Sequence, residues 1–136
     1  MNKPNKAPFD LGYRMPAEWA PHEATWLIWP HNRKDWPAKL APIAWVYGEM
    51  IRKIAPGEGV RIVVRSKSQE AAARRILERA GVTLDRVEFF RWPTDRAWIR
   101  DSGPIFVRRE ELLPEVAIAS FRFNAWARYA DFKRDD

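Results

Sequence analysis

The stretch VRIVVRSKSQEAAARRILERAG, residues 60–81, decides the fold class of this 136-residue chain. Its first six residues alternate and are rich in β-branched side chains, which predicts a strand. Ser66 and Gln69 follow as a plausible capping box, and apolar residues then recur at helical spacing from Ala73 to Ala80. Gly81 is typical of a helix end. A strand that runs directly into a helix indicates an α/β fold.

Upstream of this stretch, the pattern adds another strand and another helix. Dense prolines in residues 1–23 predict an extended leader. The unbroken apolar run at residues 24–30 predicts a buried strand. Residues 42–55 predict a helix, because Pro42 suits a first helical position and apolar residues recur at helical spacing after it. Gly48 lies inside that helix at a cost of about 1 kcal/mol relative to alanine, which a close helix–sheet contact would explain.

Downstream, the pattern continues with strands. Strands are expected at residues 86–92, 104–109 and 116–123, and residues 110–114 are expected to form the turn between the last two. Helices alternate with strands at first, and a hairpin closes the set. The order therefore predicts an α/β fold with a mixed sheet in a single domain.

Composition excludes several classes of protein. The hydrophobic fraction of 46% and the charged fraction of 31% argue against disorder and against a membrane protein. No apolar run approaches the roughly 20 residues of a membrane span. There is no cysteine, which excludes disulfides, thiolate metal sites and cysteine nucleophiles within these residues. The first residues have no apolar h-region, so no secretory signal is expected and the cytoplasm is the expected compartment.

The charge balance is basic, with a net charge of +6 and a pI of about 10.0. Such a balance can indicate a polyanionic partner. Here lysines and arginines are spread along the chain, which favours a solvated basic surface and no nucleic-acid partner. Eight tryptophans are an unusual number for this length. They suggest large flat side chains that line a pocket or pack between a sheet and helices.

The segment PTDRAWIRDSGP, residues 93–104, concentrates the candidate chemistry. Read as an extended chain, it places Asp95 and Asp101 on one side and Trp98 on the other. Two carboxylates can act as general acid and base, bind a hard metal or clamp a cation. A metal site normally requires more ligands than two acids. A clamp on a planar guanidinium requires a bidentate acid, a second acid and a flat π-face, which these three residues supply.

Arginines in the same segment allow a different interpretation. Arg96 and Arg100 could pair with the two acids of the segment and form a structural ion network. The nearest histidines, His22 and His31, are more typical of surface or capping roles. Spacing alone leaves both interpretations of the segment open.

Four motifs in one order go further: GYRMPAEWAPHEATWLIWPHN, DWPAK, PTDRAWIRDSGPIFV and FRFNAW. Together, over about residues 12–129, they resemble the agmatine deiminase family, relatives of the bacterial peptidylarginine deiminases. The resemblance implies a pentein fold, in which modules surround a central pocket with pseudo-fivefold symmetry. This chain would hold only the first module or two. The resemblance also implies hydrolysis of agmatine to N-carbamoylputrescine and ammonia, a step toward putrescine, with no metal or organic cofactor.

The resemblance assigns roles to individual residues. Asp101 matches the acid of the family's W-x-R-D-x-G-P motif, which implies that it holds the guanidinium nitrogens as a catalytic and substrate-binding residue. Trp98 is the tryptophan of that motif and would wall the pocket. Asp95 would be a second contact to the cation. Arg100 would orient Asp101 or the loop. Ala127 and Arg128 depart from the glycine and lysine that the family usually has there.

The family's nucleophile is a cysteine, which attacks the guanidinium carbon and forms a covalent amidino-enzyme intermediate. That cysteine and the histidine that moves protons lie downstream of the region matched here. Since an unactivated guanidinium is a poor electrophile, this chain alone is expected to bind agmatine without turning it over. Open strand edges would make it marginal, aggregation-prone or oligomeric. The alternative is a non-catalytic remnant that binds a guanidino ligand, or a fragment similar to a peptidyl-arginine deiminase.

Overall fold

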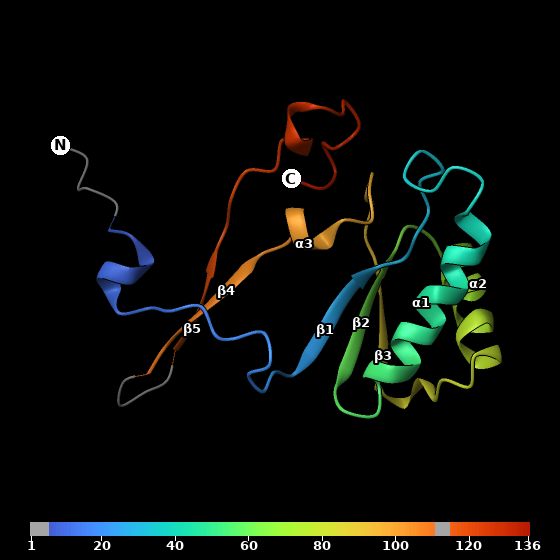
Figure 1. The fold of residues 1–136 in the computed structure, drawn as a ribbon, viewed down its shortest axis with the longest axis horizontal. Helices are drawn as coiled ribbons and strands as arrows, with labels where there is room; N and C mark the ends of the chain where they lie inside the picture. The colour runs from blue at the N-terminus through green and yellow to red at the C-terminus, as the bar shows by residue number, and fades with distance from the viewer. Residues whose placement is uncertain (1–5, 111–114) are drawn as a thin grey trace. The chain divides into compact units, whose positions relative to one another are not determined.

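A computed structural model describes residues 6–110 and 115–136 (Figure 1). These residues form two units, one of residues 22–102 and 123–136 and the other of residues 6–21 and 103–122 within the described ranges. The elements of the larger unit are β1 (Ala24–Ile28), α1 (Leu40–Ile54), β2 (Gly59–Val64), α2 (Lys67–Arg79), η2 (Leu84–Arg86), β3 (Val87–Arg91), α3 (Ile99–Ser102) and η3 (Ala125–Ala127). The elements of the smaller unit are η1 (Pro8–Leu11), β4 (Ile105–Arg109) and β5 (Glu115–Ala119).

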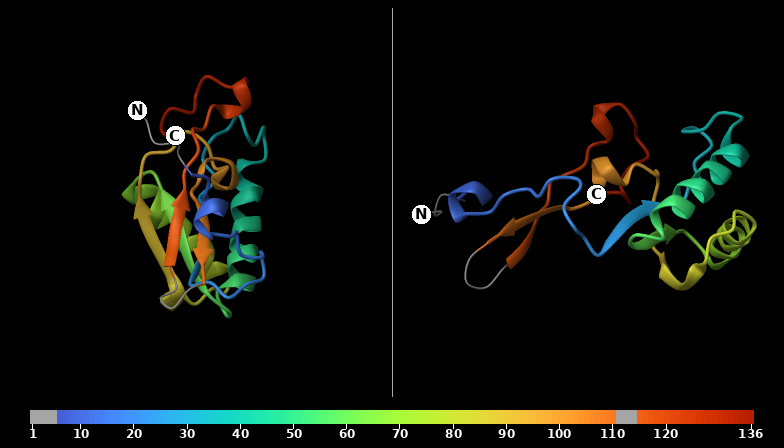
Figure 2. Two further views of the ribbon diagram at one scale, coloured as in Figure 1. Left: turned by 90° about the vertical axis from the view of Figure 1, so that its left-hand side faces the viewer. Right: turned by 60° about the horizontal axis from the view of Figure 1, so that its bottom comes forward.

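The larger unit is built on a parallel sheet of order β1-β2-β3. Leu27 pairs with Ile62, and Ile62 pairs with Phe89. Both α1 and α2 cover the same face of this sheet (Figure 1, Figure 2). Ile51 of α1, Leu77 of α2 and Ile62 are 0% exposed between these layers. Burial of each such side chain contributes about 1.5–3 kcal/mol, so this layer is the main core of the unit.

The opposite face of the sheet is partly covered by the chain that follows β3, which includes the one-turn helix α3. Ala97 of that segment is buried against Ile28 and Val63, and Ile99 packs beside them. The rings of Trp26, Phe90 and Trp92 form an aromatic cluster on this side, and the Trp26 and Phe90 centroids are 4.9 Å apart. Packing of Ala97 and Ile99 fixes the path of the segment that holds the candidate site residues.

Most of the expected elements are confirmed, and the differences have local causes. The α/β class is confirmed, but the parallel and antiparallel strands form two separate sheets instead of one mixed sheet. The extended interpretation of the candidate segment is wrong from Ile99 onward, where a helical turn begins. The explanation for Gly48 is also wrong: a Cβ there would lie 3.3 Å from the Ala80 Cβ, so the close contact is between α1 and the end of α2. Of the expected turn, residues 111–114 lie outside the described residues.

The smaller unit is an antiparallel β4–β5 pair in which Ile105 faces Ala119. Arg109 forms an ion pair with Glu115 at 2.5 Å, and its guanidinium lies 5.0 Å from the Tyr13 ring centroid. An isolated antiparallel β-bridge joins Arg14 to Arg108, so the segment around Arg14 lies along the edge of the β4–β5 pair. Across both units, no helix of the described residues is long and apolar enough to cross a bilayer.

Three consecutive non-glycine residues in η3 have left-handed backbone angles, with φ of 51° at Ala125, 56° at Trp126 and 55° at Ala127. This conformation costs about 1–2 kcal/mol per residue that carries a Cβ. We expect Ala127→Gly to raise the free energy of unfolding by roughly 0.5–1 kcal/mol, since relief of this strain exceeds the added chain entropy of glycine. Urea unfolding measures the change.

Ala71→Gly is the matched control, because Ala71 lies inside α2. There the same substitution should lower the free energy of unfolding by about 1 kcal/mol. Losses of equal size at both positions would contradict the left-handed turn.

Candidate active site

The candidate site lies where β1 and β3 end. The Trp29 N–H donates to the Val63 carbonyl at 2.9 Å, and the Trp92 N–H donates to the Val64 carbonyl at 3.0 Å. Both chains then leave the sheet. Because the strands are parallel, residues 30–39 and 93–98 emerge at the same edge. Ligand sites of parallel α/β sheets usually lie beyond the carboxyl ends of the strands.

Trp98 and Asp101 lie one turn apart at the start of α3. The Asp101 N–H donates to the Trp98 carbonyl at 3.1 Å. Trp98 is 38% exposed, and the centroid of its ring lies 5.5 Å from that of Trp36 with an angle of 31° between the rings. Asp101 is exposed, and within residues 6–110 and 115–136 no hydrogen bond or ion pair engages its carboxylate. An accessible carboxylate and an exposed indole face are groups that can bind a planar cation.

Asp95 is tied to the neighbouring chain in three ways. Its carboxylate accepts a hydrogen bond from the Arg134 N–H at 3.1 Å. Its own N–H donates to Asp135 Oδ1 at 2.8 Å, and its carbonyl accepts from Asn32 Nδ2 at 2.9 Å. These contacts anchor the loop to the C-terminal segment and to the β1–α1 connection. A role for Asp95 as a second substrate contact stays a prediction.

Arg96 forms the ion network that spacing left open, but with other acids than those of its own loop. The residue is only 2% exposed. Its guanidinium donates to Asp35 and, at 2.6 Å, to Asp131 Oδ1. The same group lies 4.3 Å from the centroid of the Tyr129 ring. Two carboxylates and an aromatic face thus bind a guanidinium here, and it is the guanidinium of Arg96 in the same chain.

Charges in this cluster reinforce one another. Burial disfavours the charged form of Arg96, but hydrogen bonds to Asp131 and Asp35 outweigh that effect and raise its pKa. The hydrogen bond from Arg96 is the largest cause that lowers the pKa of Asp131 to about 2. A lowered carboxyl pKa means that the stabilisation from Asp131 is complete above its ordinary value of about 3.9 and is lost as the pH falls toward about 2.

An NMR titration of the side-chain carboxyl carbons tests this coupling. We expect Asp131 to titrate near pH 2 in the natural chain, and the midpoint to rise toward about 3.9 in Arg96→Gln, which lacks the positive charge. The same midpoint in both proteins would contradict the pairing.

Several buried polar atoms at this edge have no hydrogen-bond partner among the described residues. They are Asp35 Oδ2, Trp36 Nε1, Thr94 Oγ1 and Asp135 Oδ2. Each such atom costs about 1–3 kcal/mol, so buried polar atoms of this kind indicate a functional or water-linked region more than simple core packing. Burial is the main cause that raises the pKa of the Asp135 carboxyl.

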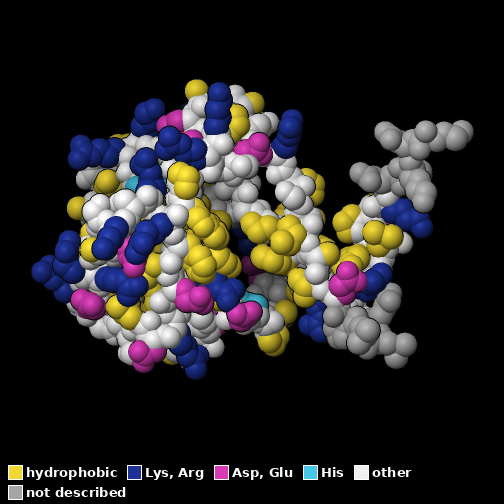
Figure 3. All heavy atoms as spheres, turned by 180° about the vertical axis from the view of Figure 1, so that it is seen from behind, with side chains coloured by type: hydrophobic (Ala, Val, Ile, Leu, Met, Phe, Trp, Pro, Cys, Tyr) yellow, Lys and Arg dark blue, Asp and Glu magenta, His cyan; other side chains and the backbone are white. Residues whose placement is uncertain are grey.

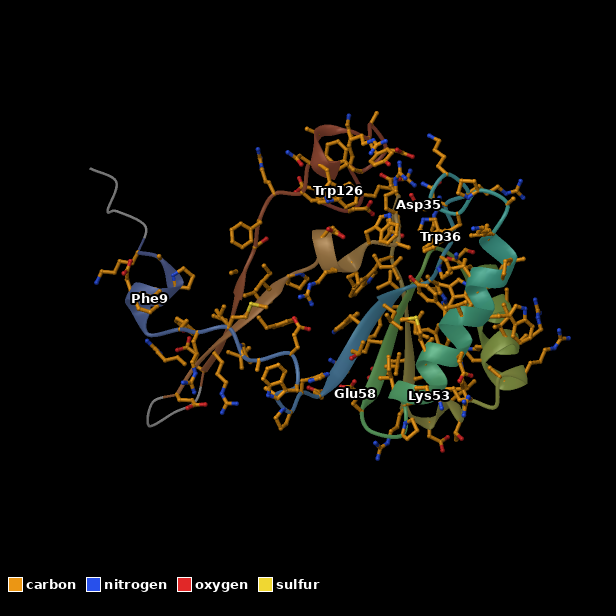
Figure 4. All side chains as sticks on the ribbon, viewed as in Figure 1. Phe9, Asp35, Trp36, Lys53, Glu58 and Trp126 are labelled. Atoms are coloured by element: carbon orange, nitrogen blue, oxygen red, sulfur yellow. The ribbon has the colours of Figure 1, made fainter. Side chains whose placement is uncertain are left out.

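Residue-by-residue reasoning on the sequence missed part of this cluster. Asp35 and Trp36 lie on the connection between β1 and α1 (Figure 4). Their motif, DWPAK, contributes to the family resemblance, which assigns no role to either residue. A Trp next to an acid after a buried strand is the signal that could have identified them. Asp131 and Tyr129 lie in a tail with no periodic pattern, and nothing in the local sequence marks them.

A cavity of about 350 Å³ lies at the same edge and is lined by His31, Arg65, Ser66, Gln69, Pro93 and Arg134. Its two arginine side chains would repel a guanidinium, and neither Trp98 nor Asp101 lines it. This cavity is therefore not the site for the cation.

Elsewhere, on the face shown in Figure 3, lysine and arginine side chains are scattered among acidic ones. No group of three or more His, Asp or Glu side chains within the described part of the chain is placed to hold a metal.

Comparison with known proteins supplies the context for this geometry. The sequence pattern of the Porphyromonas-type peptidyl-arginine deiminases matches residues 14–136. Agmatine deiminase of Stutzerimonas stutzeri is 35% identical over 130 residues, which cover 92% of this chain and 33% of that protein. Agmatine deiminase of Pseudomonas aeruginosa is 33% identical over 141 residues, covering 100% of this chain and 36% of that protein.

Solved structures agree in fold. An agmatine deiminase of Enterococcus faecalis superimposes with a TM-score of 0.78 at 27% identity, covering 94% of this chain and 34% of that one. The substrate-bound agmatine deiminase of C. jejuni gives a TM-score of 0.72 at 26% identity, covering 90% of this chain and 34% of that one. The chain thus spans about a third of the length of these relatives. The expected pentein-type α/β fold, present in part, is confirmed.

Proposed function

The chain belongs to the Porphyromonas-type peptidyl-arginine deiminase family, and from that membership we propose that it is the N-terminal part of an agmatine deiminase. Its substrate would be agmatine, and the complete reaction would add water to the guanidinium carbon and release ammonia. The product would be N-carbamoylputrescine, and its formation would be a step toward putrescine. Relatives named as agmatine deiminases that match 92% and 100% of the chain support this substrate.

One observation carries the proposal: the Asp101 carboxylate is exposed, one turn after an indole that lies against a second indole. A carboxylate can accept two parallel N–H bonds from a guanidinium and fix its plane. An indole face adds cation–π attraction of about 0.5–2 kcal/mol. Asp101 would therefore orient the guanidinium, and Trp98 with Trp36 would wall the site.

The chemistry of the chain's own residues ends at binding. Attack on a guanidinium carbon needs an activated nucleophile such as a thiolate, and the 136 residues contain no cysteine. Within these residues Asp101 can hold the cation and exclude competing orientations. The covalent step would require a nucleophile that these residues do not supply.

The family name points to a second substrate class, arginine within a peptide. Agmatine and an arginine side chain share the guanidinium, but agmatine ends in a free amine, whereas a peptidyl arginine carries bulky amides. The relatives named above favour the smaller substrate. Nα-blocked arginine amide therefore serves as the competing ligand in the test.

Isothermal titration of the chain tests the proposal directly. We expect agmatine to bind at least about tenfold more tightly than putrescine, which keeps both cationic ends but lacks the guanidinium fork. Agmatine should also bind more tightly than Nα-blocked arginine amide. The same incubations should yield no N-carbamoylputrescine above a protein-free blank. Equal affinity for putrescine and agmatine would refute a guanidinium site.

A further inference from the structure

Arg96 is the most buried charged side chain of the candidate segment, and its partners come from three separate stretches of chain. Asp35 lies on the β1–α1 connection, Arg96 lies in the loop after β3, and Asp131 lies in the C-terminal segment. Side-chain exposure is 3% for both Arg96 and Asp35. A buried ion pair held by hydrogen bonds cannot open at one partner without leaving the other charge unpaired. These three segments are therefore coupled.

Both indoles of the proposed site lie close along the chain to members of the Arg96 cluster. Asp35 is adjacent to Trp36 in the chain, and Arg96 lies two residues before Trp98. The centroids of these two indoles are 5.5 Å apart. A change in the Arg96–Asp35 contact would thus shift the two indoles relative to one another.

The C-terminal segment, residues 123–136, reaches the cluster through Asp131. Lys34 Nζ lies 3.3 Å from Asp131 Oδ2. The Asp95 N–H donates to Asp135 Oδ1, and the Arg134 N–H donates to Asp95 Oδ2. Tyr129 covers the Arg96 guanidinium. The segment is held from several directions, but Arg96 is the cation that joins it to a buried carboxylate.

We propose that Arg96 is a positioning residue: gripped by Asp35 and Asp131 and covered by Tyr129, it fastens residues 123–136 to the loop after β3 and so holds Trp98 and Asp101 in their binding geometry. The expected effect on agmatine binding rests on the proposed function, whereas the expected effect on the order of the loop after β3 does not. Arg96 itself does not touch the substrate, because it is buried and each of its three guanidinium nitrogens already donates to Asp35 or Asp131.

Two variants break the cluster from opposite sides. Arg96→Ala removes the guanidinium, and Asp131→Ala removes its more exposed partner and leaves the Arg96–Asp35 pair in place. Asp85→Ala is the matched control, since Asp85 is an exposed acid on η2. Chymotrypsin cleavage after Trp126, Tyr129 and Phe132, followed by mass spectrometry, reports release of the segment. Amide hydrogen exchange at Asp101 reports the order of the loop.

We expect cleavage within residues 123–136 to rise at least about tenfold in Arg96→Ala and Asp131→Ala, with faster exchange at Asp101, because local opening controls both rates. Asp85→Ala should match the natural chain. Added guanidinium ion, at about 50 mM and far below denaturing concentrations, should protect the segment in Arg96→Ala, because it can bind between Asp35 and Asp131 in place of the missing side chain. Sodium chloride at the same concentration should not. Agmatine affinity should fall at least about fivefold in Asp131→Ala, since a disordered site pays for ordering on binding.

Protection of residues 123–136 that is unchanged in both variants would overturn the inference. So would release of the segment with unchanged exchange at Asp101. If agmatine binds neither the natural chain nor the variants, the proposed function fails, while exchange at Asp101 and the guanidinium rescue still decide the role of Arg96. A variant that unfolds globally is identified by loss of exchange protection in β2, and the other variant then decides.

Discussion

Replacement of Arg96 by alanine is expected to lower the free energy of unfolding by about 3–5 kcal/mol, the largest effect among the substitutions considered for this chain. The cost arises because Asp35, 3% exposed, would keep a buried carboxylate without a cation. Loss of the contact between Arg96 and the Tyr129 ring adds to it. Urea unfolding followed by circular dichroism measures the change as a shift of the midpoint.

Arg52→Ala is the control for this prediction. Arg52 also forms an ion pair, with Glu49 at 2.6 Å, but its side chain is 40% exposed on α1. Surface pairs contribute about 0–1 kcal/mol, so this variant should unfold almost like the natural chain. Equal effects of the two substitutions would mean that Arg96 acts as an ordinary surface charge.

Asp101→Asn should weaken agmatine binding by about tenfold to a hundredfold while the fold is retained. The substitution keeps the size and one acceptor oxygen but removes the charge that a guanidinium requires, and hydrogen bonds to charged groups contribute about 1.5–3 kcal/mol. Asp101 is exposed and its carboxylate holds no described part of the chain in place. Stability should therefore change little. Calorimetric titration of agmatine and a urea unfolding curve give the two readouts.

Asp85→Asn applies the same chemical change away from the site, on η2. Agmatine affinity should match the natural chain, which excludes a general effect of net charge. If both variants lost the same affinity, binding would be a nonspecific attraction of a cation to acidic residues, and the assignment of Asp101 would be wrong.

Much of the fold follows from local sequence patterns. The helix after Ser66 begins with a side-chain cap, in which Ser66 Oγ accepts from the Gln69 N–H at 3.2 Å, as the capping box predicts. Alternation in residues 60–65 correctly predicts β2. The sequence predicts these elements because each depends on residues within a few positions of one another. It does not predict the four-residue α3, since one turn is too short to show a helical period.

The candidate site depends on both local and distant residues. A contiguous motif predicts roles for Asp101 and Trp98, and these roles stay predictions. The partners of Arg96 are 61 and 35 residues away in the chain, so no spacing rule relates them. The acids that bind Arg96 are therefore different from Asp95 and Asp101, and only the tertiary structure brings them to this guanidinium. The Asp95 carboxylate accepts a hydrogen bond from the Arg134 N–H, a contact across 39 residues that no local pattern indicates, and its role toward a substrate stays a prediction.

Binding of a guanidinium at Asp101 and Trp98 can be mapped by NMR, through titration of agmatine into the isotope-labelled chain. We expect the largest shifts at the Trp98 indole N–H and at the amides of residues 98–102, and nearly unchanged signals with putrescine at the same concentration. Shifts that centre on the cavity lined by His31, Arg65 and Arg134, or no shifts at residues 98–102, would show that Asp101 and Trp98 do not form the guanidinium site.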